Sequence, residues 1–372
     1  MKSILIRALK KPITAVLLAI AVGFIIGAIT LALGGFNPGR GFSLLFTGVF
    51  SSSRRMMQVL VNAVPIVMTG LAVSFASRTG LFNIGADGQF IMGQVTGAIL
   101  GYYVPMPAII HPLFILVSAF AIGGIYGSFA AWLKNRFGIH EVISTIMLNW
   151  IAYYFMNFVV NMKSVKVPGS QHSPEILDTA KITFFSREFR TTAEGEAFLA
   201  KYPWLESVVR TDAGYAIIIM LLMTLALWII LKYTRIGFEL RAVGYNFYAA
   251  EFSAMPVRRN ALLSMFIAGG TAALGGAMLV MSTSHFISML GATEGYGWDG
   301  ISVALIAGNH PIGCLFAGLL YSGLKLGGTE IQSRLGAPTE IINIMIGVLV
   351  LCIAFAPALP RLAERLERKV EA

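Results

Sequence analysis

The stretch MQVLVNAVPIVMTGLAVSFAS, residues 57–77, sets the character of this sequence because it contains no charged side chain. A helix that crosses the roughly 30 Å hydrocarbon layer of a bilayer needs about 20 such residues. Comparable apolar runs recur along the chain near 12–34, 87–104, 108–133, 141–160, 214–233, 260–282, 299–309, 311–327 and 338–356. The sequence therefore predicts an all-α polytopic membrane helix bundle.

The composition of the 372-residue chain supports this prediction. Hydrophobic residues make up 56% and charged residues 12%, about half the roughly 25% charged residues of a soluble domain. A soluble protein of this size could not cover its surface with so few charges, and a disordered chain would need more polar residues to stay dissolved. Much of the surface is therefore expected to face a lipid bilayer.

The run at 299–309 is short for a membrane span. It ends at Gly308-Asn309-His310-Pro311, where a helix would lose backbone partners unless protein or water supplied them. We therefore expect a broken or re-entrant pair with the run at 311–327. Counting this pair as two gives about ten spans in a single domain covering residues 1–372.

The net charge of +10 is distributed unevenly along the chain. Sixteen Lys and Arg residues lie in segments that a cytoplasmic N-terminus would place inside, against five in the short segments outside, which favours cytoplasmic N- and C-termini by the positive-inside rule. The charge thus indicates membrane anchoring, and no nucleic-acid partner is expected. Arg54 and Arg55 lie on the outer side and form a local exception that the sequence does not explain.

The segment 161–212 interrupts the apolar pattern. It contains seven acidic and seven basic residues, Trp204 and several Phe residues. Such a segment is too polar to cross a membrane and too aromatic for a plain linker. We expect it to form a small ordered insert on the external side.

A second polar segment, 234–259, lies between two long apolar runs on the predicted cytoplasmic side. Its sequence TRIGFELRAVGYNFYAAEFSAM, residues 234–255, mixes basic, aromatic and small residues. It is consistent with an amphipathic helix that lies on the membrane surface. It is equally consistent with a docking helix that enters a groove on a soluble partner, with Tyr245, Phe247 and Tyr248 as anchors beside Arg241.

Few polar side chains fall within the apolar runs, and those that do are costly in hydrocarbon. Asn83, Asp87 and Gln89 lie together at a span junction with two glycines, which is typical of a backbone break that lines a substrate path. The same pattern also fits a helix cap, with Asp87 accepting first-turn amide groups. Asn149 is expected to bond to a neighbouring helix in preference to a substrate. These four residues are the candidates for a translocation path.

Known catalytic and cofactor motifs are missing from the sequence. It contains no GxxxxGK[ST] phosphate-binding loop and no GxSxG nucleophile motif. His140-Glu141 opens a zinc-protease-like HExx pattern, but Ser144 stands where the second histidine would be needed. We therefore predict no catalytic residue, no metal site and no cofactor site in this chain.

Four stretches together resemble one known family. They are the segment 234–255, GLFNIGADGQFIMG at 80–93, TIMLNWIAYY at 145–154, and GYGWDGISVALIAGNHPIG at 295–313. The sequence resembles permease subunits of bacterial ATP-binding cassette (ABC) importers, in the branch that serves branched-chain amino acids, ribose and nucleosides. It is most similar to the nucleoside-type permeases that work with a basic-membrane-protein-like binding lipoprotein, and the resemblance covers about residues 57–356.

This resemblance implies a heteromeric importer in the bacterial cytoplasmic (inner) membrane. Its other parts would be an ABC ATPase that binds ATP and Mg²⁺, a second permease that is usually a paralogue, and an external substrate-binding lipoprotein. The implied cargo is a nucleoside or a related ribosyl compound, with sugars or branched-chain amino acids as the alternative. An ion-coupled secondary transporter is a further alternative, although such proteins rely on intramembrane ionisable groups at broken helices.

The resemblance also assigns the ATPase-coupling role to segment 234–259. The residues that match the family's coupling motif are Gly237, Arg241, Ala242, Gly244, Asn246, Ala249 and Ala250. The family usually has a glycine shortly after them, whereas this chain has Ala254, followed by Met255-Pro256. We therefore expect Pro256 to build the sharp turn that ends the coupling helix.

Overall fold

The computed structural model describes residues 12–360 and 363, and its regular elements are helical throughout that part of the chain. The two β-bridges found there, His172 with Ser288 and Thr183 with Gly214, are isolated. The helices in chain order are α2 (Pro12–Leu33), α3 (Pro38–Phe50), α4 (Ser53–Ser77), α5 (Ala86–Tyr103), α6 (Ile110–Phe137), α7 (Glu141–Asn161), η1 (Asp178–Ala180), η2 (Phe189–Thr191), α8 (Ala193–Lys201), η3 (Pro203–Leu205), α9 (Glu206–Val209), α10 (Tyr215–Tyr233), α11 (Arg235–Tyr245), α12 (Phe247–Phe252), α13 (Val257–Leu279), η4 (Val280–Ser284), α14 (Tyr296–Ile306), α15 (Pro311–Leu335), α16 (Thr339–Phe355) and η5 (Ala356–Ala358).

Six of the described helices are long and apolar enough to cross a membrane: α4, α6, α7, α10, α13 with η4, and α15. A seventh span results if α2 and α3, which bend by 118° at their junction, are taken as one. The all-α class is therefore confirmed, whereas the count of ten spans stays a prediction. The predicted cytoplasmic termini also stay a prediction, because residues 1–11 and most of 361–372 lie outside the described part.

The structure contains a break between α14 and α15, which the sequence predicts, and a sharp bend between α2 and α3, which it does not. The expected break at 308–311 is present, since α14 ends at Ile306 after 11 residues and α15 begins at Pro311. The pair that bends sharply, however, is α2 with α3, and the apolar runs did not predict α3 at all. A signal for α3 is visible in the sequence: Asn37 caps the helix by accepting the Arg40 N–H, and Pro38 occupies its first turn.

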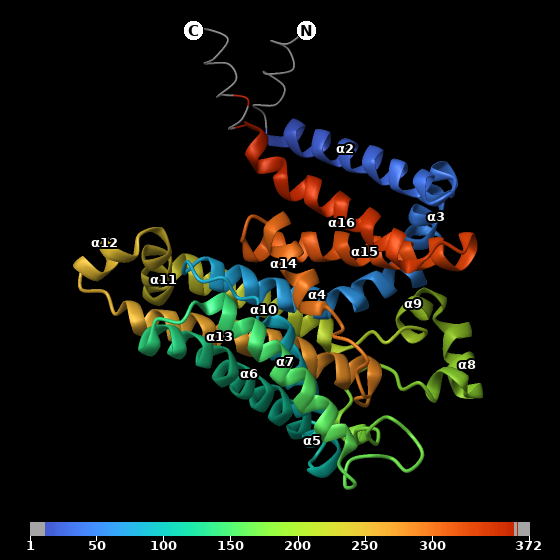
Figure 1. Ribbon diagram of the computed structural model, residues 1–372. Coiled ribbons are helices and arrows are strands. Elements are labelled where there is room, and N and C mark those ends of the chain that lie inside the picture. The colour runs from blue at the N-terminus through green and yellow to red at the C-terminus, as the bar shows by residue number, and fades with distance from the viewer. Residues whose placement is uncertain (1–11, 361–362, 364–372) are drawn as a thin grey trace.

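Helix α13 forms the hub of the bundle and packs against α4, α5 and α6 (Figure 1). Small residues make this possible. A Cβ atom on Gly93 of α5 would overlap the carbonyl oxygen of Ala273, and one on Gly123 of α6 would overlap the Ala273 side chain. Glycines on α5 and α6 thus allow these helices to approach the backbone of α13 closely. The same contacts bury most residues of α5, among them Asp87, Gln89 and Gln94.

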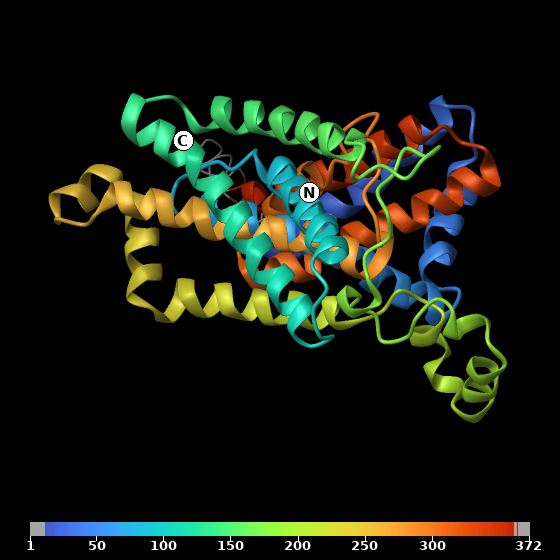
Figure 2. The same ribbon diagram turned by 90° about the horizontal axis from the view of Figure 1, so that it is seen from below.

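The two polar segments lie at opposite ends of the bundle. Figure 1 shows α11 and α12 projecting at one end and the insert helices α8 and α9 at the other, and the view in Figure 2 agrees. Within the insert 161–212, Phe185, Phe189, Phe198 and Tyr202 pack ring to ring. Its position outside the membrane stays a prediction.

The structure gives a partner to Arg55, one of the two arginines that break the positive-inside pattern on the predicted outer side. Arg55, in the first turn of α4, forms an ion pair of 2.7 Å with Glu330 of α15. Arg334 pairs with the same carboxylate from one turn further along α15. The charge of Arg55 is therefore partly neutralised within the protein, which weakens it as a topological signal.

Candidate functional site

Helix α11 is positioned by a tight turn at the end of α10. The Thr234 hydroxyl accepts the Gly237 N–H at 3.1 Å and so caps the helix. A Cβ atom on Gly237 would overlap the carbonyl oxygen of Ile230, one turn before the end of α10. Glycine at this position therefore allows α11 to fold back directly onto α10.

The remaining residues of the predicted coupling motif shape the short helix α12. The Asn246 N–H donates to the Ala242 carbonyl at 3.1 Å, and the Asn246 side chain accepts the Ala249 N–H at 3.0 Å. Ala250 is buried beside Val243. Asn246 thus ends α11 and begins α12 in one residue, and the motif residues hold the two helices in a fixed angle.

The projecting end of α11 and α12 presents aromatic side chains to its surroundings. Tyr245 is 87% exposed, Tyr248 79% and Phe252 94%. Large aromatic residues are the usual anchors of protein interfaces, and a membrane bundle has no internal use for them at a projecting tip. This end of the protein is therefore suited to contact a partner.

The turn after α12 corrects one prediction. Ala254 itself adopts the left-handed conformation, with φ of +57°, whereas Pro256 caps the start of α13. The Met255 N–H donates to the Ala250 carbonyl and the Ala254 N–H donates to the Glu251 carbonyl, both at 3.0 Å. This is the hydrogen-bond pattern of a glycine-type helix end, formed here with alanine. The reversal does not depend on proline.

Helix α11 docks onto the loop between α4 and α5. A Cβ atom on Gly244 would overlap the carbonyl oxygen of Arg78 in that loop. The Arg78 Nε donates at 2.6 Å to the carbonyl of Asn309, in the turn between α14 and α15. Arg241 lines a cavity of about 160 Å³ with Arg78, Gly244 and Asn309. One contact region therefore joins α11 to four helices of the bundle.

His310 lies in a positively charged part of this region. Burial lowers the pKa of its imidazole below the usual value, and the charges of Arg78 and Lys232 lower it further. Its Nδ1 accepts the Gly313 N–H at 3.4 Å and caps α15. His310 is thus neutral at pH 7 and serves the fold as a helix cap.

The four candidates for a translocation path lie together in the structure, in a compact buried network. Asn83 and Gln89 exchange two side-chain hydrogen bonds, of 2.9 and 3.1 Å. The side-chain oxygen of Asn149 accepts the Gly88 N–H at 2.8 Å, and the side-chain NH₂ group of Asn149 donates to the Ile84 carbonyl at 2.9 Å. The expectation that Asn149 bonds to a neighbouring helix is confirmed. These amides satisfy the broken backbone at the start of α5.

Asp87 acts as a helix cap, but for a helix other than its own. Its Oδ1 accepts the N–H of Gly297 at 2.9 Å, in the first turn of α14 and 210 residues further along the chain. The second oxygen, Oδ2, is buried without a hydrogen-bond partner. Asp87 therefore fastens α5 to α14, and its second oxygen keeps one acceptor position for another group.

A second polar cluster within the bundle escaped the sequence analysis. Lys325 of α15 forms an ion pair with Asp299 of α14, and the Tyr321 hydroxyl donates to the same carboxylate at 2.7 Å. The sequence carries a signal for it, since Asp299 and Lys325 are opposite charges inside two neighbouring apolar runs. Lys325 is one of the five basic residues that the charge pattern places in short outside segments, whereas it lies within α15, ten residues before the end of that helix.

Comparisons with known proteins show the family to which the chain belongs. A family model described as "Branched-chain amino acid transport system / permease component" matches residues 55–354. The chain belongs to this permease family. As a family member it is a transport subunit without a catalytic domain, and an ABC permease of this kind implies ATPase and binding-protein partners.

Individual relatives cover most of the permease. It is 35% identical over 356 residues to the guanosine ABC transporter permease protein NupP of Bacillus subtilis, covering 95% of this permease and 96% of the relative. The glucose ABC transporter permease protein TsgB13 of Haloferax volcanii is 29% identical, with 91% and 85% covered. A second guanosine ABC transporter permease protein of Bacillus subtilis, NupQ, is 25% identical, with 70% and 77% covered. No solved structure matches the permease significantly.

Proposed function

We propose that this permease is one of two membrane subunits of an ATP-driven importer for nucleosides or related ribosyl compounds. The observation that carries the proposal is the 35% identity to a guanosine permease along almost the entire length of both chains. A cargo of sugars is the second candidate, because a glucose permease is 29% identical over a similar length. Branched-chain amino acids are a third, suggested by the family description.

The proposed assembly contains three further kinds of subunit. ATP and Mg²⁺ bind on an ABC ATPase, and an external lipoprotein delivers the cargo. The second permease is a paralogue, a pairing supported by the two different guanosine permeases of Bacillus subtilis. In the bacterial cytoplasmic membrane, the end with α11 and α12 then faces the cytoplasm and the insert 161–212 faces outward.

The geometry of α11 supports a route for the conformational signal. ATP-driven closure of the ATPase would displace α11 and α12 through their exposed aromatic residues. Gly244 holds α11 against the loop at Arg78, and Arg78 is bonded to the turn at Asn309, so a displacement reaches α4, α5, α14 and α15 together. Coupled rigid-body motion of this kind is a standard way to convert an outward-facing bundle to an inward-facing one.

We propose a positioning role for the path candidates. Asn83, Gln89 and Asn149 use their amides on each other and on the backbone, so they hold the wall of the path in place. Asp87 adds the link to α14. Substitution of any of them is expected to change transport through the packing of α5 against α7 and α14.

Reconstitution of the complete importer tests the proposed cargo. The permease, its partner permease, the ATPase and the lipoprotein would be placed in vesicles with ATP inside and equal concentrations of radiolabelled guanosine, glucose or leucine outside. We expect guanosine to accumulate, and an unlabelled pyrimidine or purine nucleoside to compete with it. Accumulation of glucose or leucine without guanosine would refute the nucleoside assignment.

A further inference from the structure

A cavity of about 220 Å³ opens between α4, α14 and α15, well away from the coupling end. Its lining includes Asn62 and Ile66 of α4, Tyr296 of α14, and Ser322, Lys325 and Thr329 of α15. Polar groups of this density are unusual among helices that are otherwise apolar. None of these residues belongs to the coupling motif or to the path candidates, so the function described so far leaves the cavity unassigned.

The polar groups of the cavity have capacity left for a ligand. Gln58 donates to the Asn62 side-chain oxygen at 3.0 Å, which leaves the Asn62 amide N–H groups for another acceptor. Lys325 uses one N–H on Asp299, and 41% of its side chain is exposed, against 11% for Asp299. An ammonium group carries three N–H donors. Lys325 therefore presents donors to the cavity while its charge is balanced from behind.

An aromatic surface completes the site. Tyr296 packs against Phe90, with ring centres 4.8 Å apart, and the Lys325 Nζ lies 5.8 Å from the Tyr296 ring centre. Phe90 is almost fully buried, so it supports the Tyr296 ring. A flat, supported ring beside amide and ammonium donors suits a molecule that has both a flat heterocycle and hydroxyl groups.

The ion pair is more than a connection between two helices. Lys325 lies ten residues from the end of α15, which places it about 15 Å from that end. Charged residues within membrane-spanning helices are costly and are concentrated on functional pathways. The exposure of Lys325 to a cavity points to contact with a passing polar molecule.

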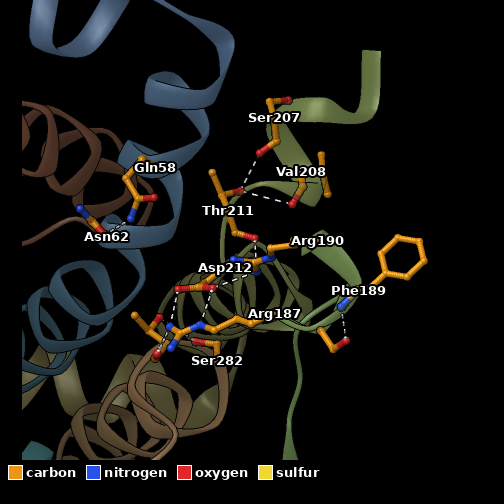
Figure 3. A network of polar contacts seen from close by, with 12 residues as sticks. Gln58, Asn62, Arg187, Phe189, Arg190, Ser207, Val208, Thr211, Asp212 and Ser282 are labelled. Atoms are coloured by element: carbon orange, nitrogen blue, oxygen red, sulfur yellow. Dashed lines mark hydrogen bonds and ion pairs between the residues drawn. The ribbon is translucent and has the colours of Figure 1, made fainter. Parts of the chain in front are cut away.

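The cavity is also close to the insert end of the bundle. Asn62 lies nine residues after the start of α4, and Gln58 lies one turn closer to that start. The start of α4 is next to the insert, since α4 contacts α9. Figure 3 shows Gln58 and Asn62 on α4 alongside the insert residues Arg187, Arg190 and Asp212. A cargo released at the insert end would therefore meet Gln58 and Asn62 first.

We infer that this cavity is a transient binding site for a neutral nucleoside in the permease itself, with the base against Tyr296 and the ribose hydroxyls on Asn62 and Lys325. The inference rests on the proposed nucleoside import. Because Asp299 balances Lys325, the site holds no net positive charge to retain a phosphate. It therefore fits nucleosides in preference to nucleotides, and it binds weakly enough to release them.

Transport kinetics of the reconstituted importer test the site. Asn62→Ala and Lys325→Met each remove hydrogen bonds to the ribose, and we expect each to raise the KM for guanosine uptake about five- to tenfold. Tyr296→Leu should do the same through lost stacking, whereas Tyr296→Phe, which keeps the ring, should retain the wild-type KM. Ser333→Ala, on an exposed face of α15, is the matched control. Ser333→Ala should keep both the wild-type KM and the wild-type lipoprotein-stimulated ATPase activity, and the other variants should still assemble with the partner subunits.

Two results would overturn the inference. One is a wild-type KM in Asn62→Ala, Lys325→Met and Tyr296→Leu. The other is loss of stimulated ATPase activity or of subunit assembly together with uptake, since that would show that the residues only hold the helices together. A wild-type importer that moves glucose and no nucleoside would instead refute the proposed function. This outcome differs from a failure of the cavity site, because it is measured on the unmodified importer and not on the variants.

Discussion

At the scale of single residues, Ala254 adopts a backbone conformation that favours glycine. Its φ of +57° lies in the left-handed region, where an L-residue with a Cβ is strained by about 1 kcal/mol relative to glycine. We therefore expect Ala254→Gly to raise the thermal midpoint of the purified permease. The same exchange at Ala249, within α12, should lower it, because glycine in a helix costs about 0.5–1 kcal/mol. Equal effects at the two positions would contradict the assigned turn.

Gly244 is the residue on which the docking of α11 depends. A Cβ atom there would overlap the backbone of Arg78, which cannot move without shifting the loop between α4 and α5. Gly244→Ala in the complete importer should therefore lower ATP-driven uptake by roughly tenfold or more and reduce ATPase stimulation. Ligand affinity of the lipoprotein should be unchanged. Gly347→Ala, at a position on α16 with open space around it, is the control and should transport normally.

Arg241 occupies the same contact and gives an independent test. It lines the cavity beside Arg78, and its Nε donates to the Gly237 carbonyl at 3.3 Å. We expect Arg241→Ala to uncouple ATP hydrolysis from uptake, as measured by the ratio of the two rates. Normal transport by both Arg241→Ala and Gly244→Ala would show that α11 is not the element that contacts the ATPase.

At the scale of elements, the insert is held by charge as well as by its aromatic residues. Asp212 pairs with both Arg187 and Arg190 at 2.9 Å (Figure 3). Arg187 also donates to the carbonyl of Thr283 in η4, which directly follows α13. Burial raises the pKa of Asp212, but the hydrogen bonds and charges of the two arginines outweigh burial and hold the pKa below its usual value. The Asp212 carboxylate therefore holds the insert together, and Arg187 links it to the bundle through Thr283.

The lowered pKa of Asp212 makes the stability of the insert depend on pH. Because the folded-state pKa is below the unfolded one, the stabilisation is complete above the unfolded value of about 3.9 and is lost as the pH falls through the folded value. Hydrogen exchange in the insert should therefore accelerate relative to the bundle only below about pH 4. Asp212→Asn should show fast exchange at neutral pH without this acid transition. An acid transition that persists in Asp212→Asn would assign the effect to another group.

At the scale of the whole molecule, the proposed importer cannot work as this chain alone. Vesicles that contain only the permease should show no nucleoside accumulation under a proton or sodium gradient, because the energy is supplied by ATP on the partner. Addition of the partner permease, ATPase, lipoprotein and ATP should restore it. Accumulation by the single chain in response to an ion gradient would favour a secondary transporter.

Much of the fold was predictable because membrane helices are encoded locally. Each long apolar run became a helix, since both apolar length and helix propensity are properties of a single segment. The ends lie within a few residues of the prediction, except that α15 continues to Leu335, eight residues past the predicted end at 327. Helix α3 was not predicted because its 13 residues are too few to span a membrane. Helix α5 is not clearly a membrane span by its composition, because it carries polar residues that its neighbours shield. The polar residues of the candidate site differ in the same respect. The predicted coupling motif is a continuous stretch of sequence, whereas Asp299 and Lys325 lie on two different helices, α14 and α15, and meet only in the folded chain.

The sequence by itself determined a helical membrane protein with a neutral polar insert, and its resemblance to a permease family predicted the coupling residues. Only the tertiary structure decided which polar groups meet. Asp87 caps a helix 210 residues away, Gly244 approaches the backbone of Arg78, and Lys325 faces a cavity beside Tyr296. Such pairings depend on how helices pack around α13, and the apolar surfaces that drive this packing are too alike in sequence to specify their partners.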